Sequence, residues 1–455
     1  MKTYALILAA GKSTRMNTSK SKMLQPMLDR GVIEYVVNNV KKSMINDIYV
    51  VVGHQKEQIM ELLKDQVTFI EQVNQKGTAD ALLSAYEELK DKQGNLLVTC
   101  GDMPLIDENI IRRVIDEHIN KKATATLLVS RVSNPKGLGR IVTKNGVFER
   151  IVEEREALIE EKKINIVNSG TYCFDIEVLF QFLRRLKKRS SGEFYLTDIF
   201  ELMVNEGKVV NLIYEEDETC MYGINDFYEL NRACNALKRK INTKHCLNGV
   251  NIQDLESTYI GIDVIISSGS TILPNTYLYG KTIIKEGAVI GPNTQINNSV
   301  IGKNSVVTNS VVDSCTIDEN CLVGPFANLK NGSHLHDNVV IGDFVEVKKS
   351  EIGHNTKAKH HAYIGDAKIG RKVNIGCGVI FANYDGKKKH LTLVKDNVFI
   401  GSNVTLVAPL EINENSYIAA GSTITDNIPQ NTLAIARQRQ VNKLEYVWKM
   451  KDKNS

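Results

Sequence analysis

The sequence predicts an α/β domain with a Rossmann-like, mostly parallel sheet, followed by a parallel β-helix of hexapeptide repeats. Two observations carry this prediction. In the second half of the 455-residue chain, apolar residues recur at every sixth position. In the first half, apolar strands alternate with helical patterns, as in a sheet covered by helices on both faces. We expect an α/β domain over residues 1–226, a linker helix over 227–248, a β-helix over 249–437 and a tail over 438–455.

The first half of the chain alternates between strand and helix patterns. Apolar runs predict strands at residues 4–10, 48–52, 95–99, 124–129 and 167–174. Helical spacing between them predicts helices that include residues 33–42, 79–89 and 108–119. An amphipathic helix over residues 225–246, with Leu230, Leu237 and Ile241 on one side, is expected to lead into the second half.

The second half repeats with a period of six. The in-phase apolar positions form two series: Ile260, Ile266, Ile272, Leu278, Ile284, Ile290 and Ile296, then Ile400, Leu406, Ile412, Ile418 and Ile424. This period fits neither a helix nor a lone strand, because each unit includes its own turn. Asn, Gly, Asp and Ser, which favour tight turns, fill the other positions. A chance alignment of isoleucines is a poor explanation for so many in-phase positions.

Composition argues against a nucleic-acid or membrane partner. Lys plus Arg (57) nearly balance Asp plus Glu (53), so no general affinity for polyanions is expected. The eight cysteines form no CxxC pair and no metal-ligand spacing, which indicates reduced thiols and a cytoplasmic location. The apolar start at residues 4–10 is too short for a signal peptide, and no run reaches membrane-spanning length. The basic tail is expected to be solvated and poorly ordered.

A loop led by glycine follows the first strand. Gly11-Lys12-Ser13-Thr14 is not a P-loop, because Leu6 stands where that motif needs its first glycine, and the Gly-x-Gly of a dinucleotide fingerprint is missing as well. The main-chain amides of this loop, together with Arg15 and Lys22, are suited to a triphosphate. Taken alone, an ordinary solvated basic loop would be the better interpretation.

Further motifs change that interpretation. The run from Leu8 to Met16, followed by Lys22, resembles the sugar-1-phosphate nucleotidylyltransferases. The resemblance extends through Gln72, Gln75, Gly77-Thr78, Gly101-Asp102-Met103-Pro104-Leu105, Gly137-Leu138-Gly139-Arg140, Ile151-Val152-Glu153, Asn168-Ser169-Gly170 and Gly223-Ile224-Asn225. With the hexapeptide half, nearly the whole chain resembles the bacterial bifunctional N-acetylglucosamine-1-phosphate uridyltransferase/glucosamine-1-phosphate acetyltransferases. The resemblance implies a left-handed β-helix, a homotrimer and a role in cell-wall precursor synthesis.

The resemblance also implies a set of ligands in the first half. Asp102 and Asn225 are implied to hold Mg²⁺. UTP and UDP-N-acetylglucosamine are implied to contact Leu8, Ala9, Ala10, Gly11, Arg15, Lys22, Gln72, Gly77, Thr78, Gly139, Glu153, Asn168 and Asn225. The implied reaction is in-line attack of N-acetylglucosamine-1-phosphate on the α-phosphorus of UTP. Because a phosphate is already an anionic nucleophile, positioning and charge neutralisation supply the catalysis.

The β-helix pattern is interrupted at residues 355–366, 374–378 and 383–386. By resemblance, His360 is the general base that deprotonates glucosamine-1-phosphate for attack on acetyl-coenzyme A. Glucosamine-1-phosphate is implied to contact Lys330, Lys348, Tyr363, Asn374 and Lys389, and acetyl-coenzyme A to contact Asn383, Tyr384, Ser402, Ala420 and Arg437.

His361 competes with His360 for the role of base. The spacing to Tyr363 favours His360, and strand alternation is expected to send the two rings to opposite faces. Cys377 suggests a covalent mechanism, but the resemblance implies a small packed residue at this position.

Two other functions remain open at this point. A nucleotidylyltransferase with a purely structural β-helix would lack His360 and the Asn383-Tyr384 pair, which are present. A non-enzymatic exchange subunit that resembles translation factors would lack Asp102, Asn225 and the phosphate-facing cations. Fold alone does not separate these alternatives.

Overall fold

The computed structural model describes residues 2–11, 14–16, 18–189 and 192–451, so Lys12 and Ser13 of the glycine-led loop lie outside the described residues. It divides into two compact units, residues 1–237 and 238–455. The division falls inside helix α8 (Phe227–Leu247), within the segment expected to be a linker helix. Lys238 and Asn242 of this helix are buried, and they donate to the carbonyls of Glu256 and Leu255, respectively, in the second unit.

The first unit is built on a mostly parallel sheet, as predicted. Its main path runs in the order β11 (Val210–Glu215), β7 (Ala125–Arg131), β10 (Ile166–Asp175), β6 (Asn95–Cys100), β1 (Thr3–Leu8), β4 (Ile48–Val52) and β5 (Thr68–Glu71). Strand β10 is antiparallel to both of its neighbours, β6 and β7, and the other pairs on this path are parallel.

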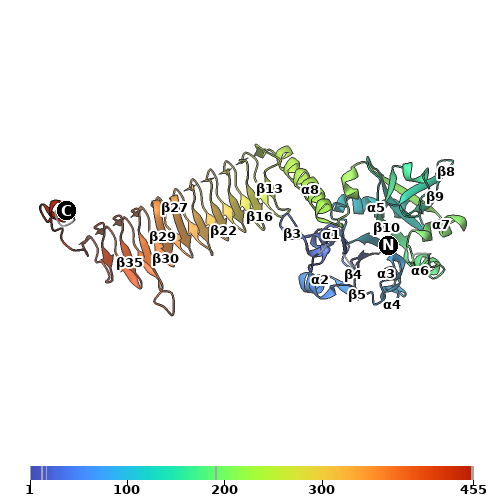
Figure 1. Ribbon diagram of the computed structural model, residues 1–455, viewed down its shortest axis with the longest axis horizontal. Helices are drawn as coiled ribbons and strands as arrows, with labels where there is room; N and C mark the ends of the chain where they lie inside the picture. Colours follow the sequence, from blue (N-terminus) through green and yellow to red (C-terminus); the bar gives the residue numbers. More distant parts are fainter. Residues whose placement is uncertain (1, 12–13, 17, 190–191, 452–455) are drawn as a thin grey trace. The chain divides into compact units, whose positions relative to one another are not determined.

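Helices cover both faces of this sheet (Figure 1). Alternate residues of β1 enter two separate cores: Ile7 packs in one with residues of α1 (Val32–Lys42) and α5 (Glu108–Asn120). Leu6 packs in the other with residues of α6 (Ile176–Leu183) and α7 (Asp198–Asn205). Burial on both faces explains why the strand is a continuous apolar run. The remaining helices are α2 (Lys56–Leu63), α3 (Thr78–Leu83) and α4 (Tyr86–Leu89).

Two local features differ from the sequence prediction. The helix expected over 79–89 is split into α3 and α4, because the Ser84 hydroxyl donates to the Asp80 carbonyl (3.0 Å) at the end of α3. A hairpin of β8 (Arg140–Lys144) and β9 (Val147–Val152) was not predicted. Its turn is Asn145-Gly146 with φ of 53° and 79°, the dipeptide that favours a tight hairpin.

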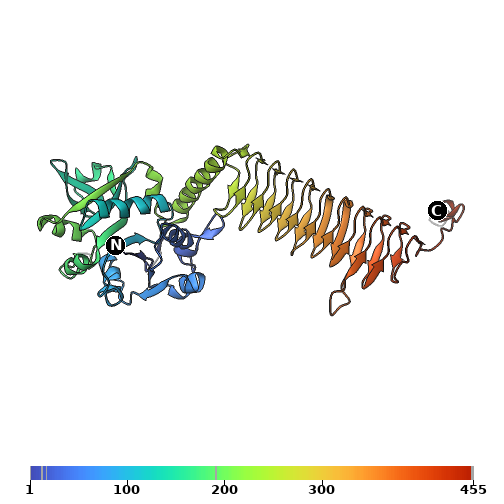
Figure 2. The ribbon, with the colours of Figure 1, turned by 180° about the vertical axis from the view of Figure 1, so that it is seen from behind.

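The second unit is a parallel β-helix whose coils stack along three faces (Figures 1 and 2). Face A holds β13 (Tyr259–Ile260), β16 (Tyr277–Tyr279), β19 (Gln295–Asn297), β22 (Val311–Asp313), β25 (Asn328–Lys330), β32 (Ile380–Ala382), β35 (Thr405–Val407) and β38 (Thr423–Ile424). Face B holds β12 (Asn251–Ile252), β15 (Thr271–Ile272), β18 (Val289–Ile290), β21 (Val306–Val307), β24 (Leu322–Val323), β31 (Asn374–Ile375), β34 (Phe399–Ile400), β37 (Tyr417–Ile418) and β39 (Leu433–Ala434).

Face C is a separate sheet of β14 (Ile265–Ile266), β17 (Ile283–Ile284), β20 (Val300–Ile301), β23 (Thr316–Ile317), β26 (His334–Leu335), β28 (Glu351–Ile352), β30 (Ala367–Ile369), β33 (Thr392–Val394) and β36 (Leu410–Ile412). Two longer strands, β27 (Val340–Lys348) and β29 (Lys357–Gly365), run from face B around the corner onto face A.

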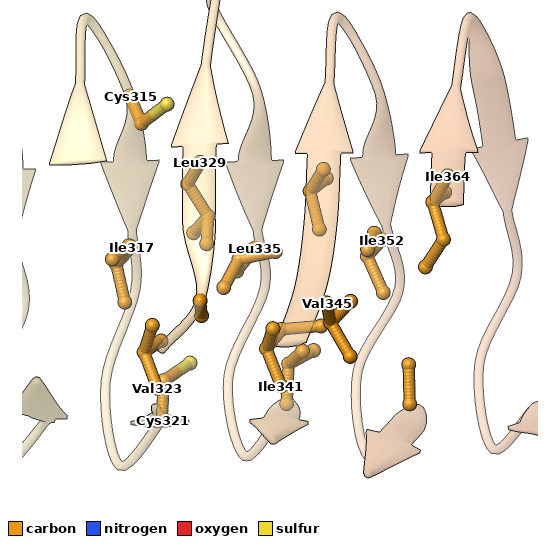
Figure 3. Close-up of a cluster of buried hydrophobic side chains, with 14 of the residues drawn as sticks. Cys315, Ile317, Cys321, Val323, Leu329, Leu335, Ile341, Val345, Ile352 and Ile364 are labelled. Carbon is orange, nitrogen blue, oxygen red and sulfur yellow. The ribbon is translucent and has the colours of Figure 1, made fainter. Parts of the chain in front are cut away.

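The in-phase apolar residues line the interior of the β-helix, as predicted. Every member of the two series is buried. Figure 3 shows Ile317, Leu335 and Ile352 of successive coils pointing into this core. Corners carry asparagines with positive φ, and Asn293 donates from its amide to Asn309 on the next coil (3.0 Å). Asparagine tolerates the left-handed conformation better than most residues, which explains its frequency in this half of the chain.

The described part of the tail is exposed, and residues Tyr446–Lys451 form the short helix α9. The tail is therefore solvated as expected, although part of it is helical. The eight cysteines, all of which lie among the described residues, form no disulfide. Among the helices described, none combines the length and apolar character that spanning a bilayer requires.

Candidate functional site

The first candidate site lies at the carboxyl ends of β1 and β6, where open sheets bind ligands. Leu8 and Cys100, the last residues of these strands, are in register, so the glycine-led loop and Asp102 leave the sheet side by side. They border a cleft of about 480 Å³. The cleft is lined by eight of the residues that the resemblance assigns to nucleotide or metal: Leu8, Ala10, Gly11, Lys22, Gln72, Gly77, Thr78 and Asp102.

Lys22 joins the two residues implied to hold the metal. Its ammonium donates to Asp102 Oδ2 (2.5 Å) and to Asn225 Oδ1 (3.2 Å), although these residues are far apart in the sequence. The Ile224 amide donates to the Asp102 carbonyl (3.1 Å) and thereby fixes Asn225 beside it. A carboxylate and an amide oxygen directed at one cation are the ligand types that Mg²⁺ prefers. The residues present therefore fit a divalent cation at this point.

The turn that carries Gln72, Gly77 and Thr78 is held by hydrogen bonds. The Gln72 amide donates to the Gly77 carbonyl (3.2 Å) and to Asp80 (2.7 Å). Gly77 has φ of 112°, and a Cβ there would overlap the Phe194 carbonyl. The neighbouring Gln75 has a buried Oε1 without a hydrogen-bond partner among the described residues. This acceptor borders the cleft and was assigned no role from the sequence.

A second side of the site is formed by the hairpin and β10. A Cβ at Gly139 would lie 3.6 Å from Glu153 Oε2 and 3.7 Å from Asn168, so these three residues lie close together. The Thr197 hydroxyl donates to Glu153 Oε1 (3.0 Å), and burial raises the pKa of the Glu153 carboxyl. Asn168 donates from its amide to the Tyr172 hydroxyl (2.7 Å).

Arg15 and Ala9, which are also implied to contact nucleotide, do not line the main cleft. Arg15 borders a smaller recess of about 170 Å³, together with Asn225, Tyr222 and Arg232. Ala9 is buried in the core against α1. Its side chain lies in this core and does not line the cleft.

A second candidate site lies on the β-helix, where lysines gather at the carboxyl ends of strands β25 and β27 on face A. Lys330 and Lys348 are in register on successive coils, and Lys330 pairs with Glu346 (2.9 Å). The Lys389 ammonium, and secondarily that of Lys330, lowers the pKa of Lys348. Lysines that repel one another in this way favour an anion between them, as a sugar phosphate would supply.

Tyr363 and Asn383 lie beside these lysines. The Asn383 amide donates to the Tyr363 hydroxyl (3.3 Å) and to Asp366 Oδ2 (2.7 Å). Gly365 is in register with Lys348, and a Cβ there would overlap the Tyr363 hydroxyl. Asp366 is buried and lies 3.9 Å from the Lys389 ammonium, so it orients Asn383 and Lys389 together. Asp366 was assigned no role from the sequence, although it ends the first interruption of the repeat.

The corner between faces B and A carries the implied base. Successive strand registers align His360 with Cys377, Ser402 and Ala420 on consecutive coils. His360, Cys377, Ser402 and Ala420 are all exposed, and they form a continuous track along one edge of the β-helix. Cys377 is therefore not the packed thiol that was expected; its side chain lies on this exposed track.

The alternation argument for choosing between the two histidines was wrong. His361 has φ of 34°, and both His360 and His361 are exposed. The reason is the corner: His360 and Ala362 are in register with Asp343 and Val345 of β27, and the intervening Phe344 also has positive φ (56°). A strand that bends at a left-handed residue does not send consecutive side chains to opposite faces. The choice of His360 therefore rests on its spacing to Tyr363 and on the aligned track.

The remaining implied residues are distributed over a wide surface. Asn374 lies on face B, in register with Lys357 and Phe399, whereas Tyr363 lies on face A. Tyr384 is 61% exposed and lies in the segment between β32 and β33. Arg437 is exposed and lies 3.7 Å from the position of a Cβ at Gly421. One copy of the chain thus divides the implied acetyl-site residues between two faces.

Comparison with known proteins covers both units. The nucleotidyl transferase family model matches residues 4–225, and the bacterial transferase hexapeptide model (six repeats) matches residues 392–426. The chain is 44% identical over 447 residues to a bifunctional protein GlmU of Acetivibrio thermocellus, covering 98% of this chain and 97% of the relative. It is 44% identical over 451 residues to GlmU of Staphylococcus epidermidis, covering 99% and 100%. GlmU of Clostridium botulinum is 44% identical over 446 residues, covering 97% of each chain.

Proposed function

The chain belongs to the GlmU family of bifunctional proteins, and from this we propose how its two units divide the chemistry. The β-helix, left-handed like other hexapeptide transferases, acetylates glucosamine-1-phosphate with acetyl-coenzyme A. The α/β unit joins the resulting N-acetylglucosamine-1-phosphate to UTP and releases pyrophosphate. The observation that carries the proposal is that each unit has its own cluster of substrate-type residues.

Uridylyl transfer is proposed to depend on positioning and charge. The Gly11 loop, Lys22 and Arg15 hold and neutralise the phosphates of UTP, while Glu153 and Asn168 hold the sugar. The sugar-phosphate oxygen attacks the α-phosphorus in line with the leaving pyrophosphate, and no protein base is needed because the nucleophile is already an anion. Asp102 and Asn225 would hold Mg²⁺, which supplies charge neutralisation when bound.

Acetyl transfer is proposed to begin with removal of a proton from the glucosamine ammonium by neutral His360. The free amine then attacks the thioester carbonyl, and coenzyme A leaves as the thiol. Lys330, Lys348 and Lys389 form the phosphate subsite. The lowered pKa of Lys348 supports this assignment, because it shows that the neighbouring ammonium groups repel one another and would be stabilised by an anion. The track through Ser402 and Ala420 leads from the base along the edge, where an extended coenzyme would lie.

A single-activity nucleotidylyltransferase with a structural β-helix is not favoured. The bifunctional relatives match both units at 44% identity, with at least 97% of this chain covered. A non-enzymatic exchange subunit is not favoured for the same reason, and the Lys22, Asp102 and Asn225 cluster counts against it.

Separability of the two activities tests this division. A truncated chain of residues 1–240 retains all of the first compact unit. We expect it to make UDP-N-acetylglucosamine from UTP and N-acetylglucosamine-1-phosphate in Mg²⁺, and to release no coenzyme A from acetyl-coenzyme A. Circular dichroism would establish that it is folded. A folded chain without uridylyl transfer would show that the assignment of this activity to the first unit is wrong.

We further propose that the β-helix assembles the chain into a homotrimer in the cytoplasm. The free cysteines suit a reducing compartment. Large apolar side chains are exposed on its faces and corners, including the stacked pairs Phe326–Phe344 (5.2 Å between ring centroids) and Phe399–Tyr417 (4.3 Å). Exposed apolar area of this kind favours association. An acetyl site shared between neighbouring copies of the chain would also explain why the implied acetyl-site residues lie on two faces of one copy.

Light scattering tests the assembly. The full chain is expected to have the mass of three copies, and the truncated chain of residues 1–240 a lower oligomeric order. Acetyl transfer should decline when the full chain is diluted until it dissociates, because the site needs a neighbouring copy. A monomeric full chain with undiminished acetyl transfer would contradict the proposal.

A further inference from the structure

A cluster of histidines and carboxylates lies on face C, outside the two sites described above. Ile317 and Leu335 point into the core of the β-helix (Figure 3), so the residues next to them along each strand point outward. Strands β23 and β26 are in register at these two residues, which places Asp318 opposite His336 on the next coil. His334 lies two residues before His336 and shares its outward face.

The three side chains converge on one point. His334 Nε2 lies 2.8 Å from Asp318 Oδ2, and His336 Nδ1 lies 3.2 Å from the same oxygen. One potential ligand atom from each residue lies within 4.8 Å of the other two. Tetrahedral Zn²⁺ with bonds of about 2.0–2.1 Å separates its ligand atoms by about 3.3 Å. Small side-chain rotations therefore convert this arrangement into three ligands of one ion.

A carboxylate orients the central ring. His336 Nε2 lies 3.0 Å from Glu351 Oε1, and its Nδ1 lies 3.2 Å from Asp318 Oδ2. With a cation bound at Nδ1, the ring carries its proton on Nε2, which donates to Glu351 because a carboxylate accepts hydrogen bonds. The cation then joins Nδ1 to the Asp318 oxygen. A carboxylate behind a ligating histidine is the common supporting arrangement of protein metal sites.

We propose that Asp318, His334 and His336 bind a divalent transition-metal ion of the Zn²⁺ class. Two imidazoles and a carboxylate suit such an ion better than Mg²⁺ or Ca²⁺, which prefer oxygen ligands. The side chains are 31%, 35% and 24% exposed, respectively, so a fourth position is open to water.

The site joins consecutive coils of the β-helix. Asp318 follows β23, the histidines belong to the coil of β26, and Glu351 belongs to β28. Bound metal would hold the coil of Asp318 to the coil of the histidines, which also carries Lys330. The contact of His336 with Glu351 extends this link to the coil that carries Lys348. His334 and Glu351 line a groove of about 550 Å³ that contains Lys389 as well. The ion is therefore expected to stabilise the β-helix next to the phosphate subsite.

Calorimetric titration with Zn²⁺ tests the site. Metal is first removed from the full chain with a chelator, and the binding of added Zn²⁺ is then measured. The wild-type chain should bind one more equivalent of Zn²⁺ than His336→Ala. Glu351→Gln should keep that equivalent with an affinity about 10–100-fold lower, as expected for loss of a supporting carboxylate. His354→Ala is the matched control, because its ring stacks 4.9 Å from His336 but pairs with Asp337 instead. It should bind as much Zn²⁺ as the wild type.

Thermal unfolding gives a second measurement. Zn²⁺ should raise the Tm of the wild-type chain and of His354→Ala, because it binds the folded state, and should leave the Tm of His336→Ala unchanged. Circular dichroism without metal would establish that each variant is folded. Equal Zn²⁺ stoichiometry in wild type and His336→Ala would overturn the proposal. Loss of an equivalent in His354→Ala, or a wild-type Tm that Zn²⁺ does not raise, would overturn it as well.

Discussion

Replacing Asp102 with Asn is expected to lower uridylyl transfer by on the order of 10²–10³-fold and to leave acetyl transfer unchanged. The substitution keeps the size of the side chain but removes the carboxylate of Asp102, which accepts from Lys22 beside Asn225. Charge neutralisation by a metal is worth several kcal/mol in transfer of this kind, and each 1.4 kcal/mol corresponds to about tenfold in rate. Pyrophosphate release would measure the first activity and coenzyme A release the second.

Two controls separate loss of the metal from loss of the fold. Asp217→Asn makes the same chemical change in the same unit, at an exposed turn where Asp217 accepts from the Thr219 amide (3.0 Å), and should keep both activities. Higher Mg²⁺ concentration should restore part of the uridylyl transfer of Asp102→Asn, because weakened binding is overcome by mass action. Equal loss of both activities in folded Asp102→Asn would contradict two independent sites.

Replacing His360 with Ala is expected to lower acetyl transfer by about 10²–10⁴-fold, the usual contribution of a general base. An ammonium group is not a nucleophile, so the amine must lose its proton before it attacks the thioester. His360 is exposed on the same edge as Ser402 and Ala420, where the base and the coenzyme would meet. Uridylyl transfer should be unchanged, and coenzyme A release at saturating acetyl-coenzyme A is the measurement.

His361→Ala is the matched control for this prediction. The two histidines are adjacent and both exposed, so the variants differ little in cost to folding. His361→Ala should retain most of the acetyl transfer. If His361→Ala shows the large loss instead, the base is the neighbouring histidine; if neither variant does, the β-helix does not use a histidine base in this loop.

The interior of the β-helix was predictable because its period is visible in the chain. Ile260, Ile272, Leu278 and Ile284 are completely buried, as the six-residue spacing requires. The corner at His361 was not predictable in the same way. His361 and Phe344 lie at the same corner on successive coils and both have positive φ (34° and 56°), a conformation that Phe rarely adopts.

The candidate sites were predictable only through resemblance. Lys22, Asp102 and Asn225 meet in space although they come from three separate segments of the chain, and no local pattern connects them. The β8–β9 hairpin, which positions Glu153, was missed although Asn145-Gly146 is a recognisable hairpin turn. Asp366 was missed because its contacts with Asn383 and Lys389 depend on its burial, which arises only in the folded chain.

The most direct test of the central claim, two independent active sites in one chain, is to mix the two inactive variants. Asp102→Asn and His360→Ala would be incubated separately and together with glucosamine-1-phosphate, acetyl-coenzyme A, UTP and Mg²⁺, and UDP-N-acetylglucosamine would be measured. Each variant alone should form little product, and the mixture should form it readily, because one variant acetylates the sugar phosphate and the other couples it to UTP. A mixture as inactive as the separate variants would contradict the claim.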